Sequence, residues 1–289
     1  MKSVKKAVVL AAGFGTRFLP ATKASPKEML PIVDTPAIQL AIEEAVHSGI
    51  TEFIIVTGRG KRAIEDHFDK SYELEELLKS KGKLEALAKV QDTYKNIQIA
   101  YVRQTEMKGT GDAVMCARNL IGDEPFAVIL PDDLIMGDVP CLRQLLDVYE
   151  EHGCSVTAAM KVNMNEVSSY GILSGTPVGD RLYDASDVVE KPKQEDAPSR
   201  YAVIGRHIFT PAIFDILEKQ GPGNGGEIVL TESMKTLMKK EKVYGFLFDG
   251  VRFDTGSPLG FVKATVYAAL QRPDMKEDLK AFVSGLIAD

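Results

Sequence analysis

A glycine-rich turn comes directly after the first apolar run of the chain. We predict a strand at residues 7–10, and Gly13 and Gly15 follow it within a few positions. Backbone N–H groups in such a turn can approach a phosphate closely, so phosphate binding is one interpretation and a structural turn is the other. Phe18 stands where a dinucleotide-binding fingerprint has its third glycine, and no Gly-Lys-Ser/Thr sequence follows. The spacing therefore excludes two familiar nucleotide motifs.

Three basic side chains follow this turn on an irregular segment that contains three prolines. They are Arg17, Lys23 and Lys27. A stiff loop holds charges in place, and both the planar fork of Arg and the point charge of Lys can neutralise a polyphosphate. A cation here can also be merely solvated, and we expect this of Lys23 rather than of Lys27.

Two adjacent acids come after an apolar run at residues 126–130. Asp132 and Asp133 therefore lie at the carboxyl end of a predicted strand, where open parallel sheets bind their ligands. Mg²⁺ prefers one or two carboxylates and takes waters and phosphate oxygens as its other ligands, and Asp254 can supply a further carboxylate. Asp133 faces the opposite side of an extended backbone, so we expect it to cap or orient. From the residues alone, a simple turn is as good an interpretation as a metal site.

Three polar residues further along are candidates for contacts with a base and a sugar. Gln104 follows a predicted strand at residues 97–102 and offers both a donor and an acceptor, which suits the edge of a pyrimidine. Glu190 and Lys191 are neighbours on an extended segment, so their side chains face opposite ways and can contact different groups. The alternatives are a surface glutamine and an exposed ion pair of small energetic value.

These motifs and their order resemble one family. Residues 13–39 are similar to the signature segment of the bacterial UTP:glucose-1-phosphate uridylyltransferases, a family of sugar nucleotidyltransferases. Further motifs follow in that family's order: Gln104 with Lys108-Gly109-Thr110-Gly111, Leu130-Pro131-Asp132-Asp133, Tyr170-Gly171, Val189-Glu190-Lys191-Pro192, Gly226-Glu227-Ile228 and Phe253-Asp254-Thr255-Gly256. The likeness spans roughly the whole chain, and an ordered set of motifs is far more specific than one motif.

The resemblance implies a role for each candidate. It implies that Asp132 and Asp254 share a Mg²⁺ ion. It implies that Arg17 and Lys27 hold a pyrophosphate leaving group and that Lys191 reaches the phosphate that joins sugar to nucleotide. The implied nucleotide-binding residues are Ala11, Ala12, Gly13, Gly15, Gln104 and Gly109, with Gln104 on uracil. The implied sugar-binding residues are Gly171, Glu190 and Glu227.

Asp112 departs from the family pattern, which often has a larger or cationic residue at this position. We expect this aspartate to cap the helix that begins near it.

The reaction implied is that of UTP with glucose 1-phosphate, giving UDP-glucose and pyrophosphate. The four histidines show neither metal spacing nor a nucleophile pattern, and a sugar phosphate is already largely dianionic at pH 7, so no general base is needed. The alternatives are the same chemistry on another NTP or sugar 1-phosphate, and a noncatalytic paralogue that binds a nucleotide sugar and regulates a partner. An NAD-dependent dehydrogenase is a rival at the level of fold, and Phe18 counts against it.

The elements that position these residues alternate between strands and helices in the first half of the chain. This rhythm predicts an α/β, Rossmann-like fold with a mixed, mainly parallel sheet flanked by helices, and the resemblance implies the nucleotide-diphospho-sugar transferase fold. The predicted strands lie at residues 7–10, 53–56, 97–102, 126–130 and 156–162. The predicted helices lie at residues 36–49, 112–120, 141–152 and from 258 onward, with two short solvated helices at 72–90.

We expect residues 1–289 to form a single nucleotidyltransferase catalytic domain. Its parts are a nucleotide-binding half at 1–161, a smaller sugar-facing sublobe at 162–256 and C-terminal helices at 257–289. A charged, proline-bearing loop at 192–198 has the character of a lid.

The composition favours a small-molecule enzyme. The net charge of −6 argues against a nucleic-acid partner. Three cysteines without metal or redox spacing indicate a reducing compartment, and no apolar run reaches the roughly 20 residues of a membrane helix. We therefore expect a cytoplasmic protein without a membrane partner, and a homodimer or homotetramer.

Overall fold

The computed structural model describes residues 2–223 and 226–288. Its centre is a nine-stranded sheet. In spatial order the strands are β5 (Gln98–Arg103), β4 (Glu52–Thr57), β1 (Lys6–Leu10), β6 (Phe126–Ile129), β11 (Tyr201–Phe209), β8 (Ser155–Lys161), β12 (Val243–Leu247), β10 (Leu182–Glu190) and β9 (Gly171–Pro177).

The five strands expected in the first half run in one direction, but they are not all neighbours. β5, β4, β1 and β6 pair in parallel. β11 then pairs antiparallel with both β6 and β8, so β8 has the direction of β6 although β11 separates them. A strand from the second half of the chain thus completes the sheet of the first half, and the boundary expected near residue 161 falls within one continuous sheet.

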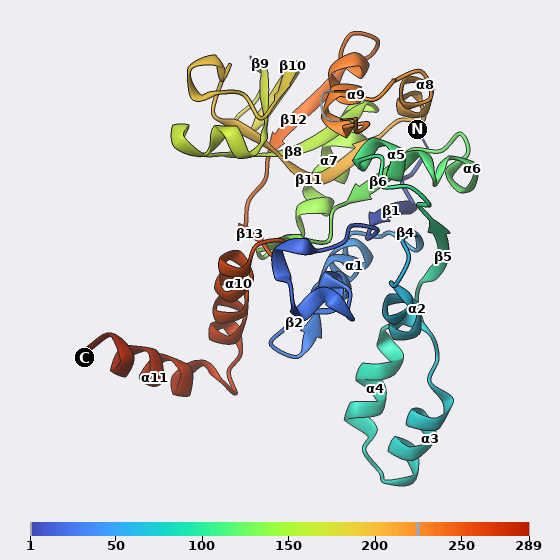
Figure 1. Cartoon of the computed structure of the whole chain (residues 1–289), viewed down its shortest axis with the longest axis vertical. Coiled ribbons are helices and arrows are strands. Elements are labelled where there is room, and N and C mark those ends of the chain that lie inside the picture. Colours follow the sequence, from blue (N-terminus) through green and yellow to red (C-terminus); the bar gives the residue numbers. More distant parts are fainter. Residues whose placement is uncertain (1, 224–225, 289) are drawn as a thin grey trace.

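Helices cover both faces of this sheet (Figure 1). The helices are α1 (Ala37–His47), α2 (Arg62–Phe68), α3 (Tyr72–Ser80), α4 (Leu84–Asp92), α5 (Thr110–Met115), α6 (Arg118–Ile121), α7 (Cys141–His152), α8 (Ala212–Leu217), α9 (Leu230–Leu237), α10 (Pro258–Gln271) and α11 (Lys276–Ala288). Alternate strand residues point to opposite faces, so Val9 packs in the core beneath α1 and α7 while Val8 packs in the core beneath α5, α8 and α9.

One predicted helix is wrong. Residues 112–120 were expected to form one helix, but the structure has α5 and α6 with a break between them. The backbone N–H of Ala117 bonds the carbonyl of Val114, three residues back, which tightens the turn and ends the α-helical register. The loop at 192–198 also contains a short 3₁₀ helix, Gln194–Asp196.

Two helical pairs extend away from the sheet in Figure 1. α3 and α4 form the expected solvated excursion, and Leu74, Leu77 and Leu84 are exposed on it. α10 and α11 follow the short strand β13 (Val251–Asp254). β13 pairs antiparallel with β7 (Asp133–Met136), which sets Asp254 opposite Asp133. This pairing brings a residue from the end of the chain to the carboxyl end of β6.

Among the described residues, no helix combines the length and apolar character needed to cross a membrane.

Candidate active site

Two cavities open beside the carboxyl end of β6. The larger, of about 510 Å³, is lined by residues that include Arg17, Glu190 and Lys191. The smaller, of about 320 Å³, is lined by residues that include Gly13 and Gln104. We call them the sugar-side cavity and the nucleotide-side cavity after the expected roles of these residues. Three residues line both: Thr110, Leu130 and Asp132. The two cavities therefore meet at the carboxylate expected to bind metal.

The glycine turn after β1 forms the edge of the nucleotide-side cavity. Gly13 lines it, and a Cβ atom at this position would have no described heavy atom within 4 Å. Gly15 has φ of 66°, and a Cβ there would lie 3.0 Å from the Cβ of Lys27. Thr22 Oγ1 donates to the Gly15 carbonyl at 2.8 Å, which fixes the turn against the basic segment. Ala11 and Gly15 do not line either cavity, whereas Ala12 lines the nucleotide-side one.

Lys27 and Asp132 form an ion pair at the junction of the cavities. Lys27 Nζ lies 2.5 Å from Asp132 Oδ2, and the two side chains are 17% and 25% exposed. Burial lowers the pKa of Lys27, but the Asp132 and Glu28 carboxylates together raise it by more, so the pKa lies above its usual value. Burial raises the pKa of Asp132, but Lys27, a backbone hydrogen bond and Arg17 together lower it by more, so this pKa lies below its usual value. Both groups are therefore charged at neutral pH.

Arg17 and Asp254 lie on the exposed side of the same junction. Arg17 Nη1 is 3.8 Å from Asp254 Oδ2, and the Arg17 side chain is 62% exposed. A pair this open contributes little to stability, which leaves the guanidinium available to a ligand. Lys23 is exposed, and its side chain makes no hydrogen bond or ion pair with any residue the structure describes, as its solvated interpretation requires; its backbone N–H donates to the Pro20 carbonyl at 3.0 Å.

Asp132 and Asp254 converge on the same point. A Cβ atom on Gly256 would lie 2.9 Å from Asp132 Oδ2 and 3.0 Å from Asp254 Oδ1. Arg17 Nη2 would also lie 3.0 Å from that Cβ, so these three side chains approach Gly256 closely and a side chain at this position would collide with them. The parts of the chain that are described hold no cluster of three or more His, Cys, Asp or Glu side chains suited to a metal. Two carboxylates without a third protein ligand are the donor set that suits Mg²⁺ beside phosphate oxygens.

Asp133 is occupied by structural partners. Its Oδ1 accepts from Arg252 Nε at 2.7 Å, and its Oδ2 accepts from the backbone N–H of Gly205 at 2.9 Å. Arg252 in turn donates to the hydroxyl of Tyr170 at 2.9 Å. Asp133 therefore ties β7 to β11 and β13, and these contacts hold the neighbouring Asp132 in position.

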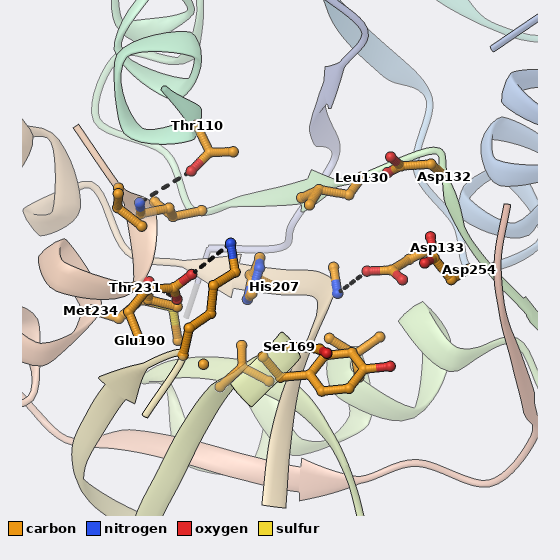
Figure 2. Close-up of a pocket in the computed structure, with 18 of the residues that line it drawn as sticks. Thr110, Leu130, Asp132, Asp133, Ser169, Glu190, His207, Thr231, Met234 and Asp254 are labelled. Atoms are coloured by element: carbon orange, nitrogen blue, oxygen red, sulfur yellow. Dashed lines mark hydrogen bonds and ion pairs between the residues drawn. The ribbon is translucent and has the colours of Figure 1, made fainter. Parts of the chain in front are cut away.

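Glu190 and Lys191 line the sugar-side cavity, and Glu190 lies across from the three aspartates. Figure 2 shows Glu190 and Thr231 on one side and Asp132, Asp133 and Asp254 on the other. Thr231 Oγ1 donates to Glu190 Oε2 at 2.7 Å, while Lys191 Nζ lies 3.5 Å from Glu190 Oε1. A Cβ on Gly171 would lie 2.8 Å from the Thr231 methyl and 3.2 Å from Glu190 Oε2, so only glycine fits there. Lys191 has a positive φ of 44°, so the backbone is not extended at this residue, and the expectation that the two side chains face opposite ways is wrong.

Gln104 forms part of the wall of the nucleotide-side cavity. Its backbone N–H bonds the Thr57 carbonyl at 2.8 Å, and its side-chain Nε2 donates to Gly109 O at 3.1 Å and Asp112 Oδ2 at 2.8 Å. The expectation that Asp112 caps a helix is wrong. α5 begins after Gly109 without a side-chain cap, because Asp112 sits inside its first turn and accepts from Gln104.

Gly109 must be glycine for two reasons. Its φ is 99°, and a Cβ there would lie 2.6 Å from the Ile228 carbonyl. Glu227, next to that contact, lines the nucleotide-side cavity and not the sugar-side one. The structure thus places Glu227 with Gln104 and apart from Glu190.

Several residues of the site carried no recognised signal in the sequence. His207 and Thr231 line the sugar-side cavity. Glu28 lines the nucleotide-side cavity, and its Oε2 accepts a hydrogen bond from Lys61 Nζ at 2.7 Å. Burial, helped by Arg206, lowers the pKa of His207 to about 3, so its imidazole is neutral. Each reaches the site through a partner far away in sequence, which leaves no local pattern to find.

Together the two cavities can hold a nucleotide and a second phosphorylated ligand with their phosphates at the shared wall. Cations lie on both sides of that wall: Arg17, Lys27 and Lys191. The arrangement can therefore bring two anionic groups together and stabilise charge that develops between them.

Comparison with known proteins agrees with this geometry. The nucleotidyl transferase family matches residues 6–270. The UTP–glucose-1-phosphate uridylyltransferase of Staphylococcus epidermidis is 51% identical over 286 residues, 99% of both chains. That of Bacillus subtilis is 51% identical over 287 residues, 99% of this chain and 98% of the relative.

Solved structures give the same result. A crystal structure of UDP-glucose pyrophosphorylase complexed with UDP-glucose matches with a TM-score of 0.87 and 45% identity, covering 93% of this chain and 100% of that one. A UTP-bound UGPase from Acinetobacter baumannii matches with a TM-score of 0.90 and 34% identity, covering 97% and 98%. The chain belongs to the nucleotidyl transferase family and, within it, to the UTP–glucose-1-phosphate uridylyltransferases.

Proposed function

We propose that this protein transfers the uridylyl group of UTP to glucose 1-phosphate, giving UDP-glucose and pyrophosphate. The observation that carries the proposal is the pair of cavities that share Asp132. UTP occupies the nucleotide-side cavity, and the sugar phosphate occupies the sugar-side cavity. Full-length relatives at 51% identity that bear this enzyme name, and related structures described with UTP and with UDP-glucose, support it.

The reaction is an in-line attack of the sugar phosphate on the α-phosphorus of UTP. An oxygen of the 1-phosphate forms the new P–O bond while the bond from the α-phosphorus to pyrophosphate breaks. No general base is required, because the attacking phosphate has a second pKa near ~6 and is already dianionic at neutral pH. Catalysis then depends on positioning and on charge neutralisation.

Three cations carry that neutralisation. Lys191, across the sugar-side cavity from Asp132, contacts the phosphate that joins sugar to nucleotide. Lys27, which lines the nucleotide-side cavity, and Arg17, which lines the sugar-side cavity beside the junction, hold the departing pyrophosphate. At an effective dielectric constant near 20, a cation about 4 Å from a unit charge is worth roughly 4 kcal/mol, so the loss of one cation can cost orders of magnitude in rate.

Asp132 and Asp254 hold Mg²⁺ in this proposal. Their convergence on the space above Gly256 and the low pKa of Asp132 support the assignment. The ion supplies charge neutralisation and orientation to the phosphate oxygens when it is bound. Lys27 then exchanges its contact with Asp132 for a contact with phosphate.

Sugar recognition belongs to Glu190, with Gly171 allowing close approach and Thr231 orienting the carboxylate. We keep Glu227 as a sugar contact, because its segment packs against Gly109, which is the neighbour of Thr110 at the junction of the two cavities. We propose the same division of the chain into a nucleotide-binding half, a sugar-facing sublobe and C-terminal helices.

We also propose that the protein works in the cytoplasm as a homodimer or homotetramer. Exposed apolar side chains on the two C-terminal helices support self-association: Leu259, Val262, Val266, Phe282 and Leu286. Sedimentation of the purified protein tests this part.

A pyrophosphate-release assay tests the reaction itself. The purified protein is supplied with each of four NTPs and several hexose 1-phosphates, with and without Mg²⁺. We expect release only with Mg²⁺ present, and fastest with UTP and glucose 1-phosphate. Equal or faster release with another pair would reassign the substrates, and no release with any pair would contradict the proposal.

A further inference from the structure

The environment of the Gln104 side chain fixes which way its amide faces. Nε2 donates to Gly109 O at 3.1 Å and to Asp112 Oδ2 at 2.8 Å. A backbone carbonyl and a carboxylate can only accept, so the end of the amide that lies between them must be the NH₂ group. Turning the amide over would place three acceptor oxygens together.

Both amide hydrogens are thus used inside the protein. Oε1 is left without a donor among the described residues, and Gln104 is buried yet lines the nucleotide-side cavity. For a ligand in the cavity, this side chain therefore provides one hydrogen-bond acceptor, Oε1, and no donor.

An acceptor that faces position 3 of a bound pyrimidine distinguishes the bases by their N3 atom. Uracil and thymine carry N3–H, which can donate to Oε1. Cytosine has an unprotonated N3, which is itself an acceptor. This atom cannot form a hydrogen bond with Oε1, and the lone pairs of the two atoms repel each other. Sites that must hydrogen-bond a ligand group discriminate strongly against a ligand that lacks it.

Asp112 holds this orientation from outside the cavity. It is half-buried in the first turn of α5, and it does not line either cavity. α5 itself is held in place, because Gly111 N donates to the Ile228 carbonyl at 2.8 Å and Ile228 N donates to the Lys108 carbonyl at 2.6 Å. The carboxylate is thus presented to Gln104 by a fixed backbone.

We propose that Asp112 is a positioning residue that locks the Gln104 amide with its oxygen toward the cavity, and so makes the enzyme select a uracil or thymine nucleotide over a cytosine nucleotide. The proposal rests on the proposed function, in which Gln104 faces the base. It adds that selection against cytosine depends on a residue that never touches the nucleotide.

Equilibrium binding of UTP, dTTP and CTP, without sugar phosphate, tests the proposal. The variants are Asp112→Leu, which cannot accept a hydrogen bond, and Asp112→Asn, which keeps an acceptor oxygen with nearly the same shape. Gln104→Leu removes the amide and so measures its full contribution to the preference for UTP over CTP. We expect Asp112→Leu to reduce the preference for UTP over CTP by about tenfold, towards the value of Gln104→Leu. Asp112→Asn should stay within a few-fold of the wild type.

The ratio of UTP to dTTP binding is the internal control, since both bases carry N3–H. It should not change in Asp112→Leu. An unchanged UTP to CTP ratio in that variant, including a uniform loss of affinity for all three nucleotides, would overturn the proposal. If Asp112→Leu fails to fold, Asp112→Ala serves instead, because alanine is the best helix former and adds no bulk. If the wild type binds none of the nucleotides, the proposed function is wrong. If the wild type binds UTP but Asp112→Leu leaves the UTP to CTP ratio unchanged, the proposed function stands and the role of Asp112 is wrong.

Discussion

The sugar-side and nucleotide-side cavities are built in different ways. On the nucleotide side, glycines let the backbone form the wall: Gly13 is open to the cavity, and Gly109 packs directly against the Ile228 carbonyl. On the sugar side, charged side chains converge from separate strands and are held by other side chains, as Glu190 is by Thr231. The nucleotide-side wall depends on glycines that carry no side chain, whereas the sugar-side wall depends on side chains that hold one another in place.

The junction of the cavities should be the most sensitive place to change. We expect Asp132→Asn to lower the rate of pyrophosphate release by at least ~10²-fold, because it removes a charge at the point where both substrates meet. Asp254→Asn and Lys191→Ala should each have effects of the same size. Asp138→Asn, on an exposed position shortly after Asp132, is the matched control and should leave the rate unchanged.

Circular dichroism and thermal unfolding of the same variants separate chemistry from folding. Near-normal turnover in a folded Asp132→Asn, Asp254→Asn, Lys191→Ala triple variant would show that the catalytic centre lies elsewhere.

His207, which lines the sugar-side cavity, should make the stability of the protein depend on pH. Its folded pKa of about 3 lies below the ordinary value of 6.5, so the unfolded state binds more protons below pH 6.5 and stability falls as the pH drops towards 3. Between pH 7 and pH 5 the wild type should lose about 2 kcal/mol more unfolding free energy than His207→Gln. Denaturant unfolding at both pH values measures this, and equal losses in the two proteins would show that His207 is protonated as readily folded as unfolded.

Two glycine substitutions sharpen the description of the nucleotide side. Gly109→Ala should raise the KM for UTP about tenfold and lower stability, because its φ of 99° and its contact with Ile228 both exclude a Cβ. Gly13→Ala has room for the extra methyl, so stability should be unchanged and only the KM for UTP should rise. Steady-state kinetics with thermal unfolding distinguish the two. A Gly13→Ala protein with normal kinetics would mean that the nucleotide does not approach this turn.

A smaller effect should separate the cavities by substrate. Thr231→Val removes the hydroxyl that donates to Glu190 Oε2 at 2.7 Å and keeps the side-chain shape. We expect the KM for glucose 1-phosphate to rise about fivefold, in line with the loss of about 1 kcal/mol for one hydrogen bond, while the KM for UTP stays the same. An equal rise in the KM for UTP would contradict the assignment of separate cavities to the two substrates.

The same contrast explains what the sequence could predict. The glycine turn and the acids after β6 are short segments that each follow a predicted strand, so their positions mark them as candidates, whereas Gly109 is marked by the family resemblance. Thr231 and Glu190 meet across 41 positions, and Arg252 reaches Asp133 across 119. No local sequence pattern predicts such contacts. The expectation that Asp112 caps a helix is wrong for a related reason, because the sequence does not show that its side chain pairs with Gln104.

The fold shows the same limit. Periodicity predicted the strands of the first half, since each strand is an apolar run with its own boundaries. It could not predict that β11 inserts between β6 and β8, because an antiparallel strand leaves no mark on the strands it separates. The break between α5 and α6 was also missed, since it depends on one tightened turn at Ala117.

The central claim is that the phosphates of both substrates meet at Asp132. A crystal structure of the protein with UDP-glucose and Mg²⁺ tests it most directly. We predict uracil in the nucleotide-side cavity, glucose in the sugar-side cavity, and the diphosphate beside Asp132 and Asp254 with Mg²⁺ between them. A diphosphate that lies away from both carboxylates would contradict the claim.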